Sequence, residues 1–330
     1  MKKKFRLIIL ALVCCIFLCG CSRQTIRGEV VEVNEDSFTL IPDGGDALTV
    51  AMGGNTSVFS WSKDVSVSDF QSGDMDGIIV SATGIVKQDT MFASEIQIEG
   101  LRIRNYYTLA DGAPVHLCKA SLYHTYSLED GAELLFVQNP TRVEETYVAG
   151  IGSLHDLPET AQEQIRAYYD AKGLLYDELQ TLEDAYDAYL AGPDFQTYTL
   201  GQEICPSAIN EEVIYFLTIV SLPGSELRLC EAFDKKTGEA IPMEEIFTCE
   251  PGEFIERLAK IAGIDDETLI EEMTAAFQTE YVTVSQSFLE VNFQAGTLPS
   301  EELPFGMGFE YNEEIRELLQ PWAVPSGVTE

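Results

Sequence analysis

The sequence predicts an α+β protein in which an all-β part precedes a larger part of mixed helices and strands. Three observations support this prediction. Short β-rich runs separated by Asp, Gly and Asn turns fill residues 25–100. Apolar side chains recur at helical spacing over residues 158–190, and strand-like runs alternate with shorter helical stretches over residues 197–319. With 330 residues, of which 45% are hydrophobic, the chain is long enough for two globular domains.

The N-terminal domain is expected at residues 21–103 as a small OB-like β-barrel. Gly84 lies inside the longest β-rich run, where a glycine allows the sharp bend that closes a barrel. The order of elements resembles that of small exported bacterial modules, through Gly28-Glu29-Val30 and the turn-like Phe-Gln-Ser-Gly-Asp of residues 70–74. Because this part is acidic and has no basic, aromatic-lined strand face, we expect a spacer or adaptor. Strands are predicted at residues 25–33, 37–41, 47–50, 77–86 and 91–98, with a turn at 68–74.

The C-terminal domain is expected at residues 104–322, with an antiparallel sheet, packed helices and a tail at 323–330. Its clearest element is a helix over residues 158–190, for which Asp156 is the predicted N-cap. Gly173 bends this helix or divides it in two, and Gly192 with Pro193 ends it. Strands are predicted at 197–205, 213–221, 226–233, 281–284, 288–293 and 305–311, and helices at 253–262, 265–278 and, capped by Asn312, up to 319.

The N-terminus has the pattern of a secretory signal. Lys2, Lys3, Lys4 and Arg6 precede a short apolar run, which ends in small residues at 18–21. The Leu-Cys-Gly-Cys at this point resembles the lipobox of bacterial lipoproteins. The resemblance implies that residues 1–20 are removed and that Cys21 carries diacylglycerol and further acyl chains such as palmitate. It implies a lipid-anchored protein on the extracytoplasmic side of the cell membrane. The alternative is an ordinary cleaved signal that leaves Cys21 as a free thiol.

Net charge restricts the partners of the chain. The full sequence has a formal charge of −35, and without residues 1–20 it has 16 Lys and Arg against 55 Asp and Glu. Like-charge repulsion excludes nucleic acid and disfavours an anionic lipid surface. The acidity indicates either a solvated surface or electrostatic complementarity to a cationic partner.

No motif in the sequence predicts a catalytic centre, a metal site or a cofactor. His116 and Cys118 would share a strand face, but a buried thiol beside a tolerated histidine explains them better than a metal site or a thiolate–imidazole pair. Ser153 and His155 have no nucleophile elbow around them. Neighbouring acids are too numerous to indicate a glycosidase pair. Outside the signal and Cys21, four cysteines allow three pairings or none: Cys118, Cys205, Cys230 and Cys249.

Three segments of the C-terminal domain resemble the extracellular domain shared by the lysozyme-sensing anti-sigma factor RsiV and the peptidoglycan deacetylase PdaC. The first is the run at residues 233–247, with an Asp-x-x-Thr-Gly turn from Asp234 to Gly238. The second is Leu-Glu-Val-Asn-Phe at 289–293, and the third is Pro-Phe-Gly-Met-Gly at 304–308 before a closing amphipathic helix. Residues 1–330 contain neither a sigma-binding segment like that of the first relative nor a catalytic domain like that of the second, so we expect neither of these activities.

The resemblance implies a non-catalytic surface lipoprotein that binds an envelope-associated partner. The favoured partner is a cationic cell-wall hydrolase of the lysozyme type, and the candidate binding loop contains Pro304, Phe305 and Met307. The alternative function is binding of peptidoglycan or glycan fragments on behalf of a separate enzyme. A third possibility is an enzyme whose site has no sequence signature.

Overall fold

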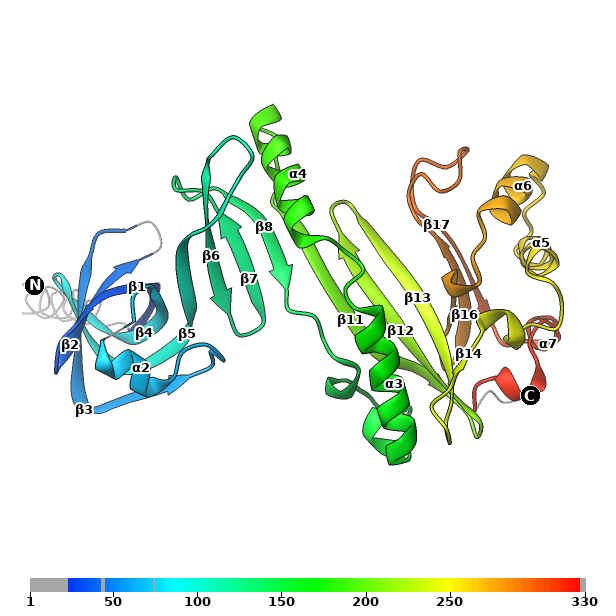
Figure 1. The fold of residues 1–330 in the computed structure, drawn as a ribbon, viewed down its shortest axis with the longest axis horizontal. Coiled ribbons are helices and arrows are strands. Elements are labelled where there is room, and N and C mark those ends of the chain that lie inside the picture. The colour runs from blue at the N-terminus through cyan, green and yellow to red at the C-terminus, as the bar shows by residue number, and fades with distance from the viewer. Residues whose placement is uncertain (1–22, 43–44, 74, 327–330) are drawn as a thin grey trace, which may run out of the picture. The chain divides into compact units, whose positions relative to one another are not determined.

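The computed structural model describes residues 23–42, 45–73 and 75–326, so the predicted signal and the predicted lipid site Cys21 lie outside the described residues. The fold is α+β with strands in the majority (Figure 1). The chain divides into two compact units, residues 1–136 and 137–330. The sequence placed this division at residue 104, but the strand that begins at Thr90 runs on to Thr108 without interruption.

Five strands of the N-terminal unit form a closed ring of pairings. β1 pairs with β2, β2 with β3, β3 with β5 in parallel, β5 with β4, and β4 with β1. The ring therefore has no open edge among these strands. The five strands are β1 (Arg23–Val33), β2 (Ser37–Pro42), β3 (Leu48–Ser60), β4 (Ile78–Lys87) and β5 (Thr90–Thr108).

The predicted turn at residues 68–74 is wrong, because helix α2 (Val67–Ser72) occupies this position. Ser66 and Asp69 form a capping box at its first turn, in which each side chain accepts a hydrogen bond from the other residue's backbone N–H. The Ser66 hydroxyl also donates to the Asp69 Oδ2 at 2.6 Å, and this bond, with the one from the Ser66 N–H, lowers the pKa of Asp69. The helix inserts Phe70 into the apolar core of the ring, where its ring meets Phe38 edge-on at a centroid distance of 5.3 Å.

Beyond the ring, β5 also pairs with the hairpin of β6 (Pro114–Ala120) and β7 (Tyr123–Ser127). Gly100 allows the close approach of β5 and β6, since a Cβ there would lie 1.7 Å from the carbonyl oxygen of Lys119. The register of the β4–β5 pairing shifts at Thr83–Gly84, where the sequence predicted a bend.

In the C-terminal unit, an antiparallel sheet is buried on both faces. Along β12 the side chains alternate, so that Ile214 and Phe216 pack against α3 while Tyr215 packs into a second core on the opposite face. The sheet is made of β11 (Tyr198–Ile209), β12 (Val213–Leu222), β13 (Ser225–Asp234) and β14 (Ala240–Ile241). The segment before the sheet contains three strands: β8 (Glu133–Gln138), and the short strands β9 (Tyr147–Val148) and β10 (Gly152–Ser153). The boundary between the two units falls within β8.

The predicted long helix is two helices, α3 (Glu159–Lys172) and α4 (Glu178–Ala191). Gly173 separates them with φ of 67° and ψ of −154°, a backbone conformation that glycine adopts much more readily than other residues. The predicted N-cap is wrong: Asp156 instead accepts hydrogen bonds from the backbone N–H and hydroxyl of Ser153, and Pro158 occupies the cap position of α3. Gly192 follows the end of α4 as expected.

The second core lies between this sheet, a small three-stranded sheet and three helices (Figure 1). Asn312 caps α7 as predicted, because its side chain accepts a hydrogen bond from the Ile315 N–H at 3.0 Å. The remaining elements are β15 (Val282–Val284), β16 (Phe288–Phe293), β17 (Phe305–Glu310), α5 (Pro251–Ile261), α6 (Glu267–Ala276) and α7 (Glu313–Arg316).

The cysteines of the described residues form no disulfide bond. Cys118, Cys205, Cys230 and Cys249 are free thiols in the structure. Burial raises the pKa of Cys230 to about 12. Within the described part of the chain, no helix has the length and apolar character that a membrane crossing requires.

Candidate functional site

A pocket of about 420 Å³ opens where β13 meets the β16–β17 hairpin. We call it the Arg228 pocket. It lies between elements far apart in the sequence and combines one guanidinium, one carboxylate and two amides with two aromatic side chains. Its main lining residues are Glu226, Arg228, Asn292, Gln294, Pro304 and Phe305.

Two glycines of β17 lie opposite polar side chains of β16, and one of them makes room for its partner. Asn292 pairs in register with Gly306, and Glu290 pairs with Gly308. A Cβ at residue 306 would lie 2.9 Å from the Asn292 Oδ1, and one at residue 308 would lie 3.8 Å from the Glu290 Cγ. Residue 306 must therefore be small for the Asn292 side chain to keep its position. This contact accounts for Gly306, whereas a Cβ at residue 308 would be at an ordinary van der Waals distance.

Arg228 carries the positive charge of the pocket. Its Nε donates to the Glu226 Oε1 at 2.7 Å, and its Nη1 lies 3.5 Å from the Glu290 Oε2. One carboxylate from the same strand and one from β16 of the three-stranded sheet thus hold the planar guanidinium. A guanidinium fixed in this way presents donors to a ligand at little entropic cost.

Asn292 supplies an unusual polar atom. Its Nδ2 is buried and has no hydrogen-bond partner in the protein. A buried donor without an acceptor costs about 1 to 3 kcal/mol, so such atoms are rare in folded proteins. An acceptor brought by a ligand to this side of the pocket would remove that cost.

The structure places the three residues of the predicted binding loop differently. Pro304 and Phe305 line the Arg228 pocket. Met307 does not: only 7% of its surface is exposed, and it belongs to the second core. The alternation along β17 puts Phe305 and Met307 on the same face, and Phe305 reaches the pocket from the strand end.

Sequence reasoning missed Arg228 and Asn292. Both lie inside strands of alternating pattern, where a polar residue normally faces solvent. Their meeting depends on the pairing of β16 with β17 and on the approach of β13, which no local pattern encodes.

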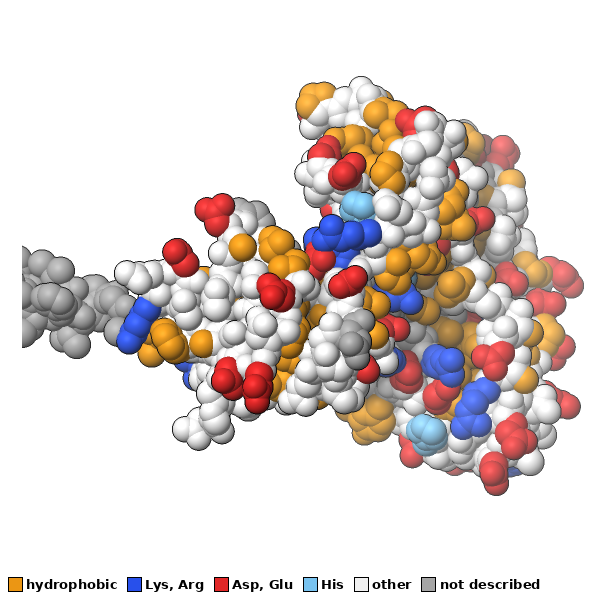
Figure 2. Space-filling view, turned by 60° about the vertical axis from the view of Figure 1, so that its left-hand side comes forward, with side chains coloured by type: hydrophobic (Ala, Val, Ile, Leu, Met, Phe, Trp, Pro, Cys, Tyr) orange, Lys and Arg blue, Asp and Glu red, His pale blue; other side chains and the backbone are white. Residues whose placement is uncertain are grey.

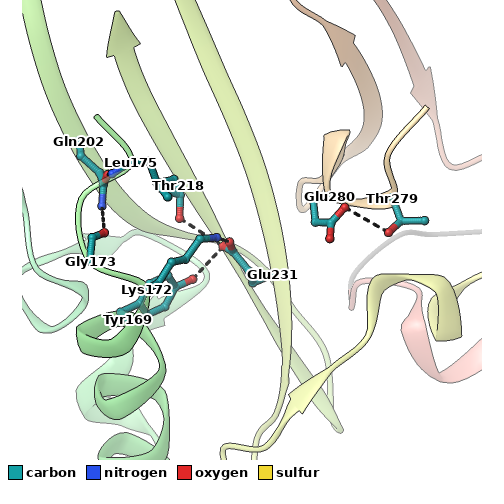
Figure 3. A network of polar contacts seen from close by, with 9 residues as sticks. All are labelled: Tyr169, Lys172, Gly173, Leu175, Gln202, Thr218, Glu231, Thr279 and Glu280. Atoms are coloured by element: carbon teal, nitrogen blue, oxygen red, sulfur yellow. Dashed lines mark hydrogen bonds and ion pairs between the residues drawn. The ribbon is translucent and has the colours of Figure 1, made fainter. Parts of the chain in front are cut away.

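A second polar centre lies under α3 and is enclosed by protein (Figure 3). Glu231 of β13 is only 5% exposed. Its Oε2 accepts hydrogen bonds from the Tyr169 hydroxyl at 3.0 Å and the Thr218 hydroxyl at 3.2 Å, and its Oε1 forms an ion pair with Lys172. Burial raises the pKa of Glu231, and the Lys172 ammonium opposes that rise. This network joins α3 to the sheet.

Next to this network, Gln202 fixes the link between α3 and α4. Its Oε1 accepts from the Leu175 N–H at 2.9 Å, and its Nε2 donates to the Gly173 carbonyl at 3.0 Å (Figure 3). Thr279 and Glu280, also drawn there, form a separate contact at 3.4 Å. The geometry is that of a structural clamp.

The other candidate residues from the sequence lie outside the Arg228 pocket. His116 and Cys118 share a face of β6, as predicted, and line a cavity of the N-terminal unit. Ser153 donates to Asp156, so its hydroxyl belongs to a turn. Over the described residues, no cluster of three or more His, Cys, Asp or Glu could hold a metal ion.

No family model and no curated protein matches the chain. Solved structures with low similarity exist. A member of the DUF3298 family from Bacteroides fragilis is 10% identical with a TM-score of 0.35, over 67% of this chain and 92% of that one. A DUF3298 family protein from Pseudomonas aeruginosa is 11% identical with a TM-score of 0.28, over 68% of this chain and 97% of that one. The structural neighbours are thus bacterial DUF3298 proteins.

Proposed function

We propose that the chain is a non-catalytic binding protein, anchored outside the cell membrane by a lipid on Cys21. Its C-terminal unit, of the type found in RsiV and PdaC, binds a cationic envelope protein such as a lysozyme-type hydrolase. The closed ring of the N-terminal unit is an OB-like barrel that serves as a spacer or adaptor. Five strands paired in the order β1-β2-β3-β5-β4, with a helix between β3 and β4, support this assignment of the barrel.

The charge of the C-terminal unit carries the proposal. Residues 137–330 contain 38 Asp and Glu against nine Lys and Arg. Figure 2 shows carboxylates scattered over the face that it draws, with lysine and arginine side chains gathered in a few places between them. On α5 and α6, Glu256, Glu267 and Glu271 are exposed. A surface of one sign steers an oppositely charged partner and raises the rate of encounter.

The mature protein is expected to bind hen-type lysozyme saturably and with strong dependence on salt. An increase of NaCl from about 50 to 500 mM should weaken the affinity about tenfold or more, because the Debye length shortens below the spacing of surface charges. Biolayer interferometry with the chain immobilised through its N-terminus measures the dissociation constant at each salt concentration. Absence of saturable binding at low salt would remove the proposal.

A matched pair of variants separates a specific surface from bulk charge. Glu256→Lys with Glu271→Lys changes exposed positions of the C-terminal unit, and Glu32→Lys with Glu35→Lys makes the same charge change in the N-terminal unit. The first pair should weaken binding at least severalfold and the second pair should leave it almost unchanged. Equal losses would indicate non-specific attraction.

The Arg228 pocket favours a second candidate function, the binding of a glycan fragment. Planar polar side chains beside an aromatic ring and a buried unpartnered amide donor suit hydroxyl and acetamido groups.

If this proposal is right, chitotriose should bind with little dependence on salt, and Asn292→Leu should abolish binding. The melting temperature of the variant should stay the same or rise, because the substitution removes the unpartnered donor. Asn34→Leu in the N-terminal unit is the control. Chitotriose binding that survives Asn292→Leu would place the glycan elsewhere.

A further inference from the structure

β17 is an edge strand, because the three-stranded sheet has the order β15-β16-β17. Its pairing with β16 is continuous from Phe305 to Glu310, without a bulge. Proteins usually protect an exposed edge with a bulge, a proline or a lysine inside the strand, or they keep the strand very short. β17 has six residues and none of these features, and every second residue along it is exposed. It is therefore an open edge that a further strand can join.

The hydrogen-bond register determines which backbone groups face this edge. The Ser285 N–H donates to the Phe288 carbonyl at 2.9 Å, so Phe288 and every second residue after it bond to β15. The residues between them bond to β17, which leaves Gly306, Gly308 and Glu310 with N–H and C=O groups that point outward. Among the described residues, no group bonds to the backbone of Gly306 or Gly308 at this edge. The edge thus offers alternating donors and acceptors at the spacing of an antiparallel strand.

The same three residues open one face of the sheet to the side chains of a neighbouring strand. Gly308 pairs with Glu290, and Gly306 pairs with Asn292. A Cβ at residue 308 would lie 4.0 Å from the Glu290 Oε1, and one at residue 306 would lie 2.9 Å from the Asn292 Oδ1. Because glycine has no side chain, long side chains of an added strand can reach these two oxygens across β17. Glu310 is exposed and would face its neighbour directly.

The charge around this edge is negative. The Glu290 Oε2 lies 3.5 Å from the Arg228 Nη1, and its Oε1 is the oxygen nearer to β17. Arg228 also pairs with Glu226, so with Glu310 three carboxylates stand against one guanidinium. Residues 286–315 contain six glutamates and no lysine or arginine. A cationic strand is therefore attracted, whereas a second copy of this chain, itself of net charge −35, is repelled.

We propose that an extended, basic segment of a partner protein pairs with the free edge of β17 as an antiparallel fourth strand. Lysine or arginine side chains at alternate positions lie opposite Glu310 and Gly308, where they meet the carboxylates of Glu310 and Glu290. The next alternate side chain lies opposite Gly306 and donates to the Asn292 Oδ1. Main-chain hydrogen bonds supply the affinity and the alternating side chains supply the selectivity. The inference rests on the proposed function, since it names the strand through which the C-terminal unit takes up its cationic partner.

Isothermal titration of the mature chain with short peptides tests the main-chain pairing. Acetyl-Lys-Val-Lys-Val-Ser-amide places its lysines and its serine opposite Glu310, Gly308 and Gly306. In an antiparallel pair the N–H groups of these three peptide residues face β17, whereas those of the two valines face away. Saturable binding with a dissociation constant below about 1 mM is expected.

Two N-methylated peptides of equal charge and composition provide the matched comparison. N-methylation of the second lysine and the serine should weaken binding about tenfold or more, because two donors to β17 are lost. N-methylation of the two valines should leave binding almost unchanged. Equal weakening by both modifications, or no binding of the unmodified peptide, overturns the proposal.

Gly308→Pro tests the same edge from the side of the protein. The N–H of this residue points outward, so the substitution keeps the bonds between β17 and β16 and removes a donor at the edge. Peptide binding should weaken about tenfold or more. Gly308→Ala keeps the N–H, and its Cβ would meet the Glu290 Cγ only at 3.8 Å, so it should weaken binding much less. Circular dichroism verifies that both variants are folded. Equal losses in the two variants would contradict main-chain pairing.

Glu310→Gln tests the predicted position of the first lysine. The variant should weaken the unmodified peptide severalfold, but it should not weaken a peptide in which glutamine replaces that lysine. Glu244→Gln, at an exposed site of the same unit, is the control and should change neither affinity. Equal weakening of both peptides by Glu310→Gln would overturn the position of the strand.

Two further measurements separate this inference from the proposed function. Equal lysozyme binding by the native chain and Gly308→Pro, with no peptide binding, would overturn the strand addition and leave the proposed function standing. Peptide binding without lysozyme binding would do the opposite. A dimer of the native chain in sedimentation that Gly308→Pro dissociates would make a second copy the occupant of β17 and overturn the proposal.

Discussion

Replacement of Glu231 by alanine should lower the free energy of unfolding by about 3 to 5 kcal/mol. The substitution leaves the Lys172 ammonium without its buried counter-charge and leaves the hydroxyls of Tyr169 and Thr218 without their acceptor. It also opens a cavity between α3 and the sheet. Urea denaturation followed by far-ultraviolet circular dichroism measures the change.

Two further variants show which part of the network matters. Glu231→Gln keeps an acceptor for the two hydroxyls and should cost less than the alanine variant, and Lys172→Met added to it should recover stability, because no buried charge then lacks a partner. Lys260→Met, an exposed lysine at the end of α5, is the control for the lysine change. A loss below about 1 kcal/mol for Glu231→Ala would contradict the inference that the Glu231 network joins α3 to the sheet.

The stability contributed by Glu231 is also expected to depend on pH. The pKa of Glu231 is raised in the folded protein, so folding favours its protonated form. Its contribution to stability is complete below the unfolded pKa of 4.5 and falls as the pH rises through the folded value. The stability advantage of the native chain over Glu231→Gln should therefore shrink as the pH rises above 4.5. An advantage that grows over this range would contradict the sign.

The second large loss of stability is expected when Gly238, in the turn after β13, is replaced by alanine. Gly238 has φ of 75°, and a Cβ there would lie 2.4 Å from the carbonyl oxygen of Ala161 and 2.7 Å from its Cα, both on α3. Gly238→Ala should lower the free energy of unfolding by about 3 kcal/mol, because a left-handed alanine is strained and the backbone of α3 must also move. Chemical denaturation measures it.

Gly224 provides a matched control in the turn before β13. Its φ of 72° is almost the same, but a Cβ there would meet nothing within 4 Å. Gly224→Ala should therefore cost only the backbone strain, about 1 to 2 kcal/mol. The difference between the two variants isolates the contact with α3. Equal losses at both positions would show that this contact does not constrain the turn.

Local sequence signals predicted much of the C-terminal unit. The bounds predicted for β16 agree with the structure, and the Asn312 cap is confirmed, because strand alternation and a capping side chain act within a few residues. The Asp234 turn is present as well: its Oδ1 accepts from the Lys236 and Thr237 N–H groups at 2.8 Å, which lowers the pKa of Asp234.

The misses share a different cause. The Ser66 capping box was overlooked because α2 is only six residues long and its composition is that of a turn. Asp156 was assigned to α3, although Ser153 competes for it from the preceding turn. The Arg228 pocket depends on contacts between strands separated by more than sixty residues, as the Arg228–Glu290 pair shows. The spacing of apolar residues along a strand indicates which of its faces is buried, but it does not indicate which distant strand covers that face.

The closed ring of the N-terminal unit affects how the chain folds while it is being synthesised. β1 must pair with β4, and β3 must pair with β5, before any edge is protected. A ribosome releases the chain from its N-terminus, at about 5 to 20 residues per second. The outer edges of the first hairpin therefore stay unpaired for roughly several seconds, until the ribosome has made β5, and during that delay they can pair with other chains.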